Sequence, residues 1–249
     1  FHDLLNQASY VNDGGTLVGY DRRIYTVSGS GAVIAADDNN LSPGDLNASG
    51  TQERNQILSC LWGQQFGGGP NLGDCRERIP ASSGHKLHGI WHSSPVVVGA
   101  PSANIASASY QTFKNAAGVK DRPTMIYFGS MGGMIHAVNA HTMKEEWAFV
   151  PPSFQTSLKN QLTTPWAGFD GTVVVRDVQL SKLAGDNSEC PADAIGTSEL
   201  FGYAASMNLC RWRTVLVACF RRGFAGPSSG SIGHGCVALD VTKPTDTTW

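Results

Sequence analysis

Charged residues are scarce in this sequence. Only 15% of its 249 residues are Asp, Glu, Lys or Arg, whereas soluble proteins average about a quarter. The formal net charge is −2, so nothing indicates a basic surface for nucleic acid. No apolar run reaches the ~18 residues of a membrane-spanning helix. We therefore expect a protein that neither binds nucleic acid nor spans a membrane.

Several motifs of catalysis and metal binding are also missing. Without any CxxC pair, the sequence excludes a zinc ribbon, a thioredoxin-like redox site and c-type haem. Serine, histidine and aspartate are all present, but no GxSxG elbow indicates a catalytic triad. The glycine-rich residues 226–235 lack the Lys-Ser/Thr pair of a phosphate-binding loop and are interpreted as a turn. We therefore expect no catalytic residue.

Two polar stretches could hold a metal ion. His85, His88 and His92 share one face only if they lie on a helix, whereas Pro95 favours the start of a strand. The sequence "DDNN" (37–40) lacks the glycine and distal glutamate of an EF-hand loop. We expect no metal site at either place. The arginine pairs Arg22–Arg23 and Arg221–Arg222 are interpreted as solvated surface residues.

Six cysteines are present, and when they are taken as three successive pairs the members of each pair lie 15 to 20 residues apart. This even count and short spacing favour local disulfides, which would place the protein outside the cytosol. The alternative is that all six are reduced thiols in the core. Of the fifteen possible connectivities, we predict the pairs Cys60–Cys75, Cys190–Cys210 and Cys219–Cys236.

Glycine is abundant, with 29 residues, and short runs rich in Val, Ile and Tyr alternate with polar turns. This pattern predicts a mainly β fold. Long loops are expected at 37–90, 101–121 and 179–199, and short helices at 110–116 and 152–162. We predict about ten strands, at 22–27, 31–36, 94–99, 124–129, 134–140, 145–150, 171–178, 200–206, 213–220 and 235–241.

Residues 135–147 and 236–249 form a weak internal repeat. In each copy a strand ends at Asn or Asp, a Thr follows, and a Trp closes the unit. The Asn or Asp side chain can accept hydrogen bonds from amides two residues further on, and the Trp can pack between neighbouring sheets. Repeated β units of this kind suggest propeller blades. The motif residues are Ala137, Asn139, Thr142, Trp147, Ala238, Asp240, Thr242 and Trp249.

The repeat resembles the tryptophan-docking motif of quinoprotein-type propellers, with Met143 where glycine is usual. Four ordered blocks resemble the C-terminal propeller domain of the PilY family of type IV pilus proteins more closely. They are "DRRIYTV", "HSSPVVVGAP", "RPTMIYFGSMGGMIHAVNAHTMKEEWAFVPP" and "WRTVLVACF…CVALDVTKP". The chain departs from that pattern at Met131-Gly132-Gly133, where Asn-Asp-Gly is usual, and at Ala218-Cys219-Phe220, where Val-Gly-Gly is usual. Residues 179–211 are an insert relative to it.

The resemblance implies an incomplete, all-β, propeller-like fold with disulfide-stapled loops, in which residues 1–249 are part of a single propeller domain cut from a longer chain. It implies a non-enzymatic protein at the pilus tip or outer-membrane surface of a Gram-negative bacterium. Its roles would be pilus assembly, control of retraction and attachment, with minor pilins and a host or abiotic surface as partners. The calcium loop of the family would lie outside this segment, so no cofactor is expected here.

The alternative function is a quinoprotein-type dehydrogenase. A quinone site needs polar groups that converge on the propeller axis from many blades, and ten strands make too few blades to close a ring. The same count predicts that the sheets end at an open edge, which further sequence or another chain must cover.

Overall fold

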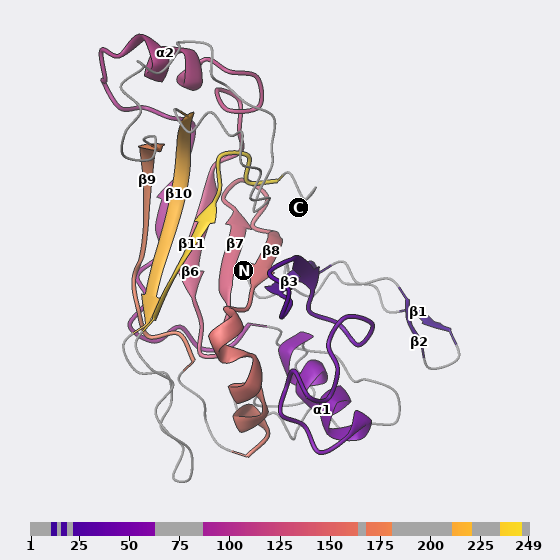
Figure 1. The fold of residues 1–249 in the computed structure, drawn as a ribbon. Coiled ribbons are helices and arrows are strands. Elements are labelled where there is room, and N and C mark those ends of the chain that lie inside the picture. Colours follow the sequence, from indigo (N-terminus) through magenta and orange to yellow (C-terminus); the bar gives the residue numbers. More distant parts are fainter. Residues whose placement is uncertain are drawn as a thin grey trace.

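The computed structural model describes residues 11–13, 16–18, 22–62, 87–163, 168–180, 211–220 and 235–245. Most of the secondary structure is β, in one six-stranded, one three-stranded and one two-stranded sheet. The two larger sheets lie against each other, with α2 at one end and α1 beside the 3-10 helix η3 at the other (Figure 1).

The six-stranded sheet has the order β4-β3-β8-β7-β6-β5. All its neighbours are antiparallel except β3 and β8, which are parallel. The strands predicted at 22–27 and 31–36 are confirmed as β3 and β4, which form an antiparallel hairpin. The strands are β3 (Ile24–Val27), β4 (Val33–Ala35), β5 (Val96–Val98), β6 (Met125–Gly129), β7 (Ile135–Asn139) and β8 (Glu145–Phe149).

The three-stranded sheet is antiparallel, with β10 in the middle. Its strands are β9 (Val173–Leu180), β10 (Arg211–Phe220) and β11 (Gly235–Asp240). The two-stranded sheet pairs β1 (Val11–Asp13) with β2 (Thr16–Val18), a hairpin that the sequence did not predict. The strand predicted at 200–206 lies outside the described residues.

The two larger sheets contain the same repeated unit of neighbouring antiparallel strands. Strands β5 to β8 form the first unit, and strands β9 to β11 form the second. In the first unit Tyr127 pairs with Ala137, and in the second Val217 pairs with Ala238. The two alanines are the equivalent motif positions, so β6–β7 and β10–β11 share one register. The first unit has β8 as a further strand beside β7, whereas β11 pairs only with β10 within the described part of the chain.

One apolar core fills the space between the units. It combines buried side chains from β6 to β8, such as Tyr127 and Trp147, with Val175 and Leu216 from the second unit. At one end Phe154, Phe169 and Phe220 pack ring against ring, with centroids 4.5–5.9 Å apart. The first unit therefore buries one face against the inner face of the second.

Both predicted helices are present, as α2 (Ala108–Lys114) and the 3-10 helix η3 (Pro152–Leu162). The prediction of a polar loop over 37–90 was wrong for its first part, because α1 (Thr51–Trp62) forms there. Glu53 accepts a hydrogen bond from the Ser49 amide just before α1 begins. The second half of α1 is buried in the core through Ile57, Leu58, Leu61 and Trp62, so packing rather than an even amphipathic pattern fixes this helix. Among the described residues, no helix has the length and apolar character to cross a membrane.

The β7–β8 loop holds a strained residue. Met143 has φ of 58°, in the left-handed region that disfavours side chains other than glycine. Its amide donates to the Asn139 carbonyl at 2.8 Å, which fixes the loop in this shape. The position at which the sequence carries Met instead of the usual glycine is thus one whose backbone favours glycine.

We expect Met143→Gly to raise the free energy of unfolding by about 1 kcal/mol, because glycine adopts this φ without strain. Urea denaturation of both proteins measures the change. Met143→Ala is the matched control, since it removes most of the side chain but keeps a Cβ at the strained φ. A glycine variant no more stable than the alanine variant would show that the backbone strain is negligible.

Candidate functional site

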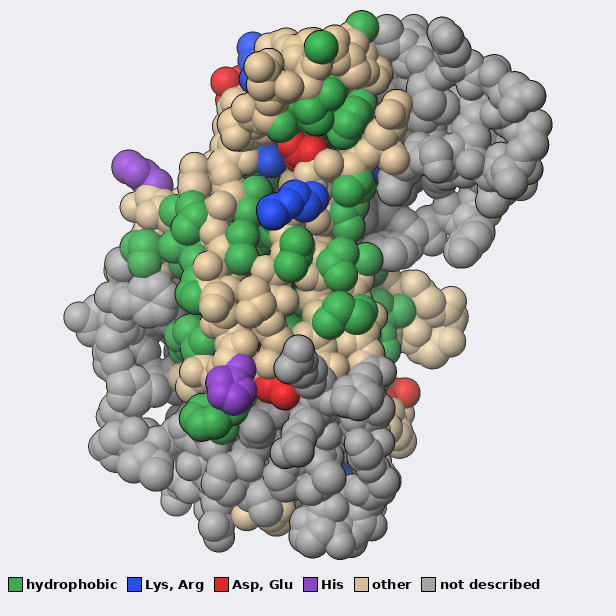
Figure 2. Space-filling view, turned by 90° about the vertical axis from the view of Figure 1, so that its left-hand side faces the viewer, with side chains coloured by type: hydrophobic (Ala, Val, Ile, Leu, Met, Phe, Trp, Pro, Cys, Tyr) green, Lys and Arg blue, Asp and Glu red, His purple; other side chains and the backbone are tan. Residues whose placement is uncertain are grey.

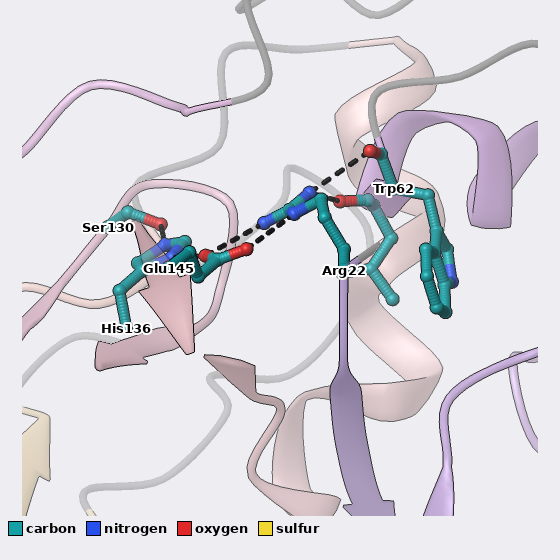
Figure 3. A network of polar contacts seen from close by, with 6 residues as sticks. Arg22, Trp62, Ser130, His136 and Glu145 are labelled. Carbon is teal, nitrogen blue, oxygen red and sulfur yellow. Dashed lines mark hydrogen bonds and ion pairs between the residues drawn. The ribbon is translucent and has the colours of Figure 1, made fainter. Parts of the chain in front are cut away.

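A buried polar network lies at the junction of β3, β7, β8 and α1 (Figure 3). Arg22, just before β3, makes a bidentate ion pair with Glu145, with N–O distances of 2.6 and 3.0 Å. The same guanidinium donates to the carbonyls of Leu61 and Trp62 at the end of α1. Arg22 therefore connects the start of β3 to the C-terminal end of α1 and to β8.

On its other side Glu145 contacts a histidine. The Nδ1 of His136 donates to Glu145 Oε1 at 2.6 Å, and its Nε2 lies 2.8 Å from the Ser130 hydroxyl oxygen. The His136 ring also stacks on Phe128. Serine, histidine and carboxylate in this order are the arrangement of a hydrolase triad.

Burial decides what this arrangement can do. Ser130 and His136 are both 0% exposed, and the neighbouring Gly129 amide is occupied by the Ser93 hydroxyl. A substrate carbonyl would need to reach the serine oxygen, yet solvent does not reach it. The network is therefore built to hold segments together rather than to attack a substrate.

The ionisation of Glu145 follows from its partners. Burial alone would raise its pKa, but the charge of Arg22 and the hydrogen bonds from His136 and Arg22 outweigh burial, so the pKa lies well below its usual range. A carboxyl whose pKa falls on folding stabilises the fold at pH values above its unfolded pKa. That contribution is lost as the pH falls below the ordinary glutamate range.

A second network joins the two sheets near α2. Arg122 donates to the Gly99 and Thr242 carbonyls and to the Thr214 hydroxyl, and Thr214 in turn donates to Asp177. The Tyr110 hydroxyl also donates to Asp177, at 2.8 Å. Burial and this contact with Asp177 raise the pKa of Tyr110 to about 12, so the phenol stays a hydrogen-bond donor at neutral pH.

The repeat motif occupies equivalent places in both units. Asn139 accepts hydrogen bonds from the amides of His141 and Thr142, and Asp240 accepts one from Thr242, as expected for these turns. Trp147 is 1% exposed. Its indole donates to the Pro244 carbonyl beyond β11 at 2.8 Å, so it fastens one unit to the next. Ala137 and Ala238 lie on β7 and β11, and Trp249 lies outside the described residues.

Two curated proteins are similar to this chain. A type IV pilus biogenesis factor PilY1 homolog of Xylella fastidiosa is 30% identical over an alignment of 167 residues that covers 63% of this chain and 11% of that protein. The type IV pilus biogenesis factor PilY1 of Pseudomonas aeruginosa is 31% identical over an alignment of 174 residues that covers 64% of this chain and 12% of that protein. Over somewhat less than two thirds of its length, the chain is therefore similar to PilY1 proteins. It spans about a tenth of the length of these relatives. No family model and no solved structure matches it.

The first departure from the PilY pattern, Met131-Gly132-Gly133, has a steric basis. A Cβ at Gly132 would collide with the ring of His88, which is buried, and Gly133 has φ of 76°. The Met131 amide donates to the Gly89 carbonyl. The turn therefore holds the preceding loop in place instead of presenting the usual carboxylate.

The second departure, Ala218-Cys219-Phe220, introduces a disulfide. Cys219 is bonded to Cys236 across β10 and β11, with 4.0 Å between the Cα atoms, and this predicted pair is confirmed. Cys60 is also disulfide-bonded, but its partner lies outside the described residues. The pairs Cys60–Cys75 and Cys190–Cys210 therefore stay predictions.

The other candidates from the sequence contribute less. His88 and His92 do not belong to a cluster of three potential metal ligands within the described part of the chain, and His85 lies outside it. The Asp37 carboxylate accepts hydrogen bonds from Asn39 and Asn40, so it closes a local turn.

Neither buried network was predicted from the sequence. The interpretation of Arg22 as a solvated surface residue is wrong, because that residue is 7% exposed and pairs with Glu145 inside the protein. Arg23 is exposed as expected. His136 and Glu145 lie on successive predicted strands, 134–140 and 145–150, which was a usable signal that their side chains could meet. The position of Arg22 was not, since 123 residues separate it from Glu145.

Proposed function

We propose that the chain is a structural module of a type IV pilus biogenesis protein. The observation that carries the proposal is the similarity to two PilY1 proteins, both named as type IV pilus biogenesis factors. Because the chain spans about a tenth of each relative, the activity of the whole protein is part of the proposal. The module would support pilus assembly, control of retraction and attachment to a surface.

The two repeated units would be blades of an incomplete propeller. Their common register, and the face-to-face packing of the first unit on the second, support this architecture. In a propeller each blade buries one face on the next. The free side of β11 would then be where the array continues.

The module would act outside the cell, at the pilus tip or outer-membrane surface, with minor pilins and a host or abiotic surface as partners. The Cys219–Cys236 disulfide supports this location, since structural disulfides persist in oxidising compartments. An extracellular module also needs stable contacts between its own segments, and the Arg22 and Arg122 networks supply such contacts.

We propose a non-enzymatic role without a cofactor in this segment. The Ser130–His136–Glu145 set supports it, because all three side chains are engaged in a buried structural network. The alternative, a quinoprotein-type dehydrogenase, would need converging polar groups. The pocket between the two units is instead lined by apolar side chains such as Tyr25, Trp147 and Leu239.

The test is deletion of residues 22–245 from the full-length protein in the organism that encodes it. We expect surface pili, recovered by shearing and detected with an anti-pilin antibody, to fall at least about tenfold at an unchanged cellular pilin level. The matched control is the unmodified allele carried through the same procedure. Normal piliation in the deletion strain would refute the proposal.

The enzymatic alternative is tested on the purified full-length protein after incubation with pyrroloquinoline quinone and calcium. We expect neither retained quinone absorbance nor alcohol-dependent reduction of an artificial dye. Turnover that requires the quinone would overturn the non-enzymatic role while leaving the pilus assay to stand by itself.

A further inference from the structure

The disulfide between β10 and β11 lies at a non-hydrogen-bonded position of the ladder. The Val241 amide donates to the Thr214 carbonyl, and Cys219 stands opposite Cys236 in the same register. Hydrogen-bonded and non-hydrogen-bonded pairs alternate along an antiparallel ladder. Val241 and Thr214 form a hydrogen-bonded pair, and the cysteines lie an odd number of positions further along. Their Cα atoms are 4.0 Å apart, in keeping with the close approach of non-hydrogen-bonded pairs.

The main-chain hydrogen bonds of the ladder therefore do not depend on this disulfide. The pairs on either side of it, Ala218 with Val237 and Phe220 with Gly235, carry the hydrogen bonds that join the two strands. When the sulfur–sulfur bond is broken, the ladder still keeps the two thiols opposite each other. The bond can thus open and re-form within the folded protein.

The two cysteines are accessible to a reagent in solution. Both Cys219 and Cys236 are exposed, on the face of the sheet that also carries the exposed side chain of Val217. Apolar side chains gather on this side of the molecule with few charges between them (Figure 2). Cys60 is also disulfide-bonded but is only 1% exposed. Because exposed disulfides are the labile ones, the bond between β10 and β11 should exchange with external thiols first.

The same disulfide closes the connection between the two strands. Cys219 and Cys236 are 17 residues apart in the sequence, and they lie next to the pair at which the ladder ends, Phe220 with Gly235. Without the cross-link, β11 returns to β10 only by closing a loop of that length, which costs conformational entropy. The cross-link removes most of that cost. Reduction should therefore let β11 separate from β10 more often.

Strand β11 takes part in the contact between the two units. Leu239 and Val241 are buried in the common core. Just beyond the strand, the Pro244 carbonyl accepts the hydrogen bond from the Trp147 indole. Separation of β11 would expose the two apolar side chains and withdraw this acceptor. How firmly the units are joined is thus coupled to the state of the disulfide.

We propose that the Cys219–Cys236 disulfide is a redox switch that sets how firmly β11 is held, and that its co-reactant is a dithiol. One thiolate of the dithiol attacks a cysteine sulfur and forms a mixed disulfide, while the other cysteine leaves as a thiolate. The second thiol of the reagent then attacks the mixed disulfide and releases the first cysteine. Two electrons and two protons pass to the cysteines, the dithiol becomes a disulfide, and a disulfide oxidant reverses the exchange.

This inference goes beyond the proposed function, because it concerns the chemistry of the purified protein and makes no use of pili. The folded protein is incubated with dithiothreitol, and thiols are blocked with N-ethylmaleimide and identified by mass spectrometry of peptides. We expect Cys219 and Cys236 to be labelled at least about tenfold faster than Cys60. The circular dichroism spectrum should stay unchanged, and glutathione disulfide should restore the bond without unfolding.

Amide hydrogen exchange then measures how firmly β11 is held. After selective reduction we expect residues 235–241 to exchange at least about tenfold faster, whereas β6 and β7 change by less than about twofold. The matched control is the double variant Cys219→Ala and Cys236→Ala. It should show the faster exchange of β11 both with and without dithiothreitol, because it has no cross-link to open.

Several results would overturn the proposal. Labelling of Cys60 as fast as that of Cys219 would show that the exposed bond is not the labile one. Unchanged exchange of β11 after reduction would show that the bond does not hold the strand. Equal loss of protection in β6 and β7 would mean that the bond stabilises the whole fold. A double variant that still responded to dithiothreitol would assign the effect to another cysteine.

Discussion

Replacing Arg22 with alanine should lower the free energy of unfolding by about 3–5 kcal/mol, the range for breaking one side of a buried ion pair. The variant leaves the Glu145 side chain, which is 5% exposed, without its bidentate partner. It also removes the donors to the Leu61 and Trp62 carbonyls. Urea denaturation monitored by circular dichroism measures the loss.

Arg23→Ala is the matched control for this prediction. Arg23 contacts Glu146 at 3.6 Å, and its side chain is 44% exposed, so its loss should change stability by less than about 1 kcal/mol. The loss of stability caused by Arg22→Ala should also shrink as the pH falls below 4.5, the ordinary pKa of glutamate. In the variant Glu145 has lost its cation, so it takes up a proton at low pH and is then no longer an unpaired buried charge. Equal effects of the two alanine variants at pH 7 would contradict a structural role for the network.

Trp147→Ala should destabilise the protein by about 3–5 kcal/mol, the usual cost of deleting a buried aromatic side chain. The indole fills the space between the two units and donates to the Pro244 carbonyl. Trp147→Phe keeps much of the volume but leaves that carbonyl without its donor, so it should cost about 1–3 kcal/mol. Thermal unfolding followed by circular dichroism ranks the three proteins.

Trp91 provides the control for loss of a tryptophan as such. It is 52% exposed, and its replacement by alanine should change stability by no more than about 0.5 kcal/mol. If Trp147→Ala were no worse than Trp91→Ala, the two units would be held together by other contacts, and the interpretation of the motif as a joint between them would be wrong.

Most of the strands could be predicted from the sequence for a physical reason. In β6 to β11 nearly every strand carries β-branched or aromatic residues between clear turn residues, and these preferences are local. The motif around Asn139 and Trp147 was equally local, because the side chain of Asn139 bonds amides two and three residues further on. Its role as a joint between sheets also followed from the residue types.

The buried networks could not be predicted in the same way. Arg22, Glu145 and Leu61 come from three separate segments, and nothing beside Arg22 in the sequence marks it as different from Arg23. The first is buried and the second exposed because successive residues of an extended chain point to opposite sides. Helix α1 was missed because its apolar residues are concentrated in its second half, where the contacts that hold it are with distant segments such as η3.

The parallel pairing of β3 with β8 has a consequence for how the chain folds. Ile24 lies beside Ala148, so 124 residues (148 − 24) must be made before that pairing can form. At the usual 5–20 residues per second of synthesis this takes roughly 6–25 s. The β3–β4 hairpin, by contrast, can close at once, because its strands are neighbours in the chain. Until β8 arrives, Ile24 and the cation of Arg22 have no native partner there, and the growing chain exposes one edge of β3 to its surroundings.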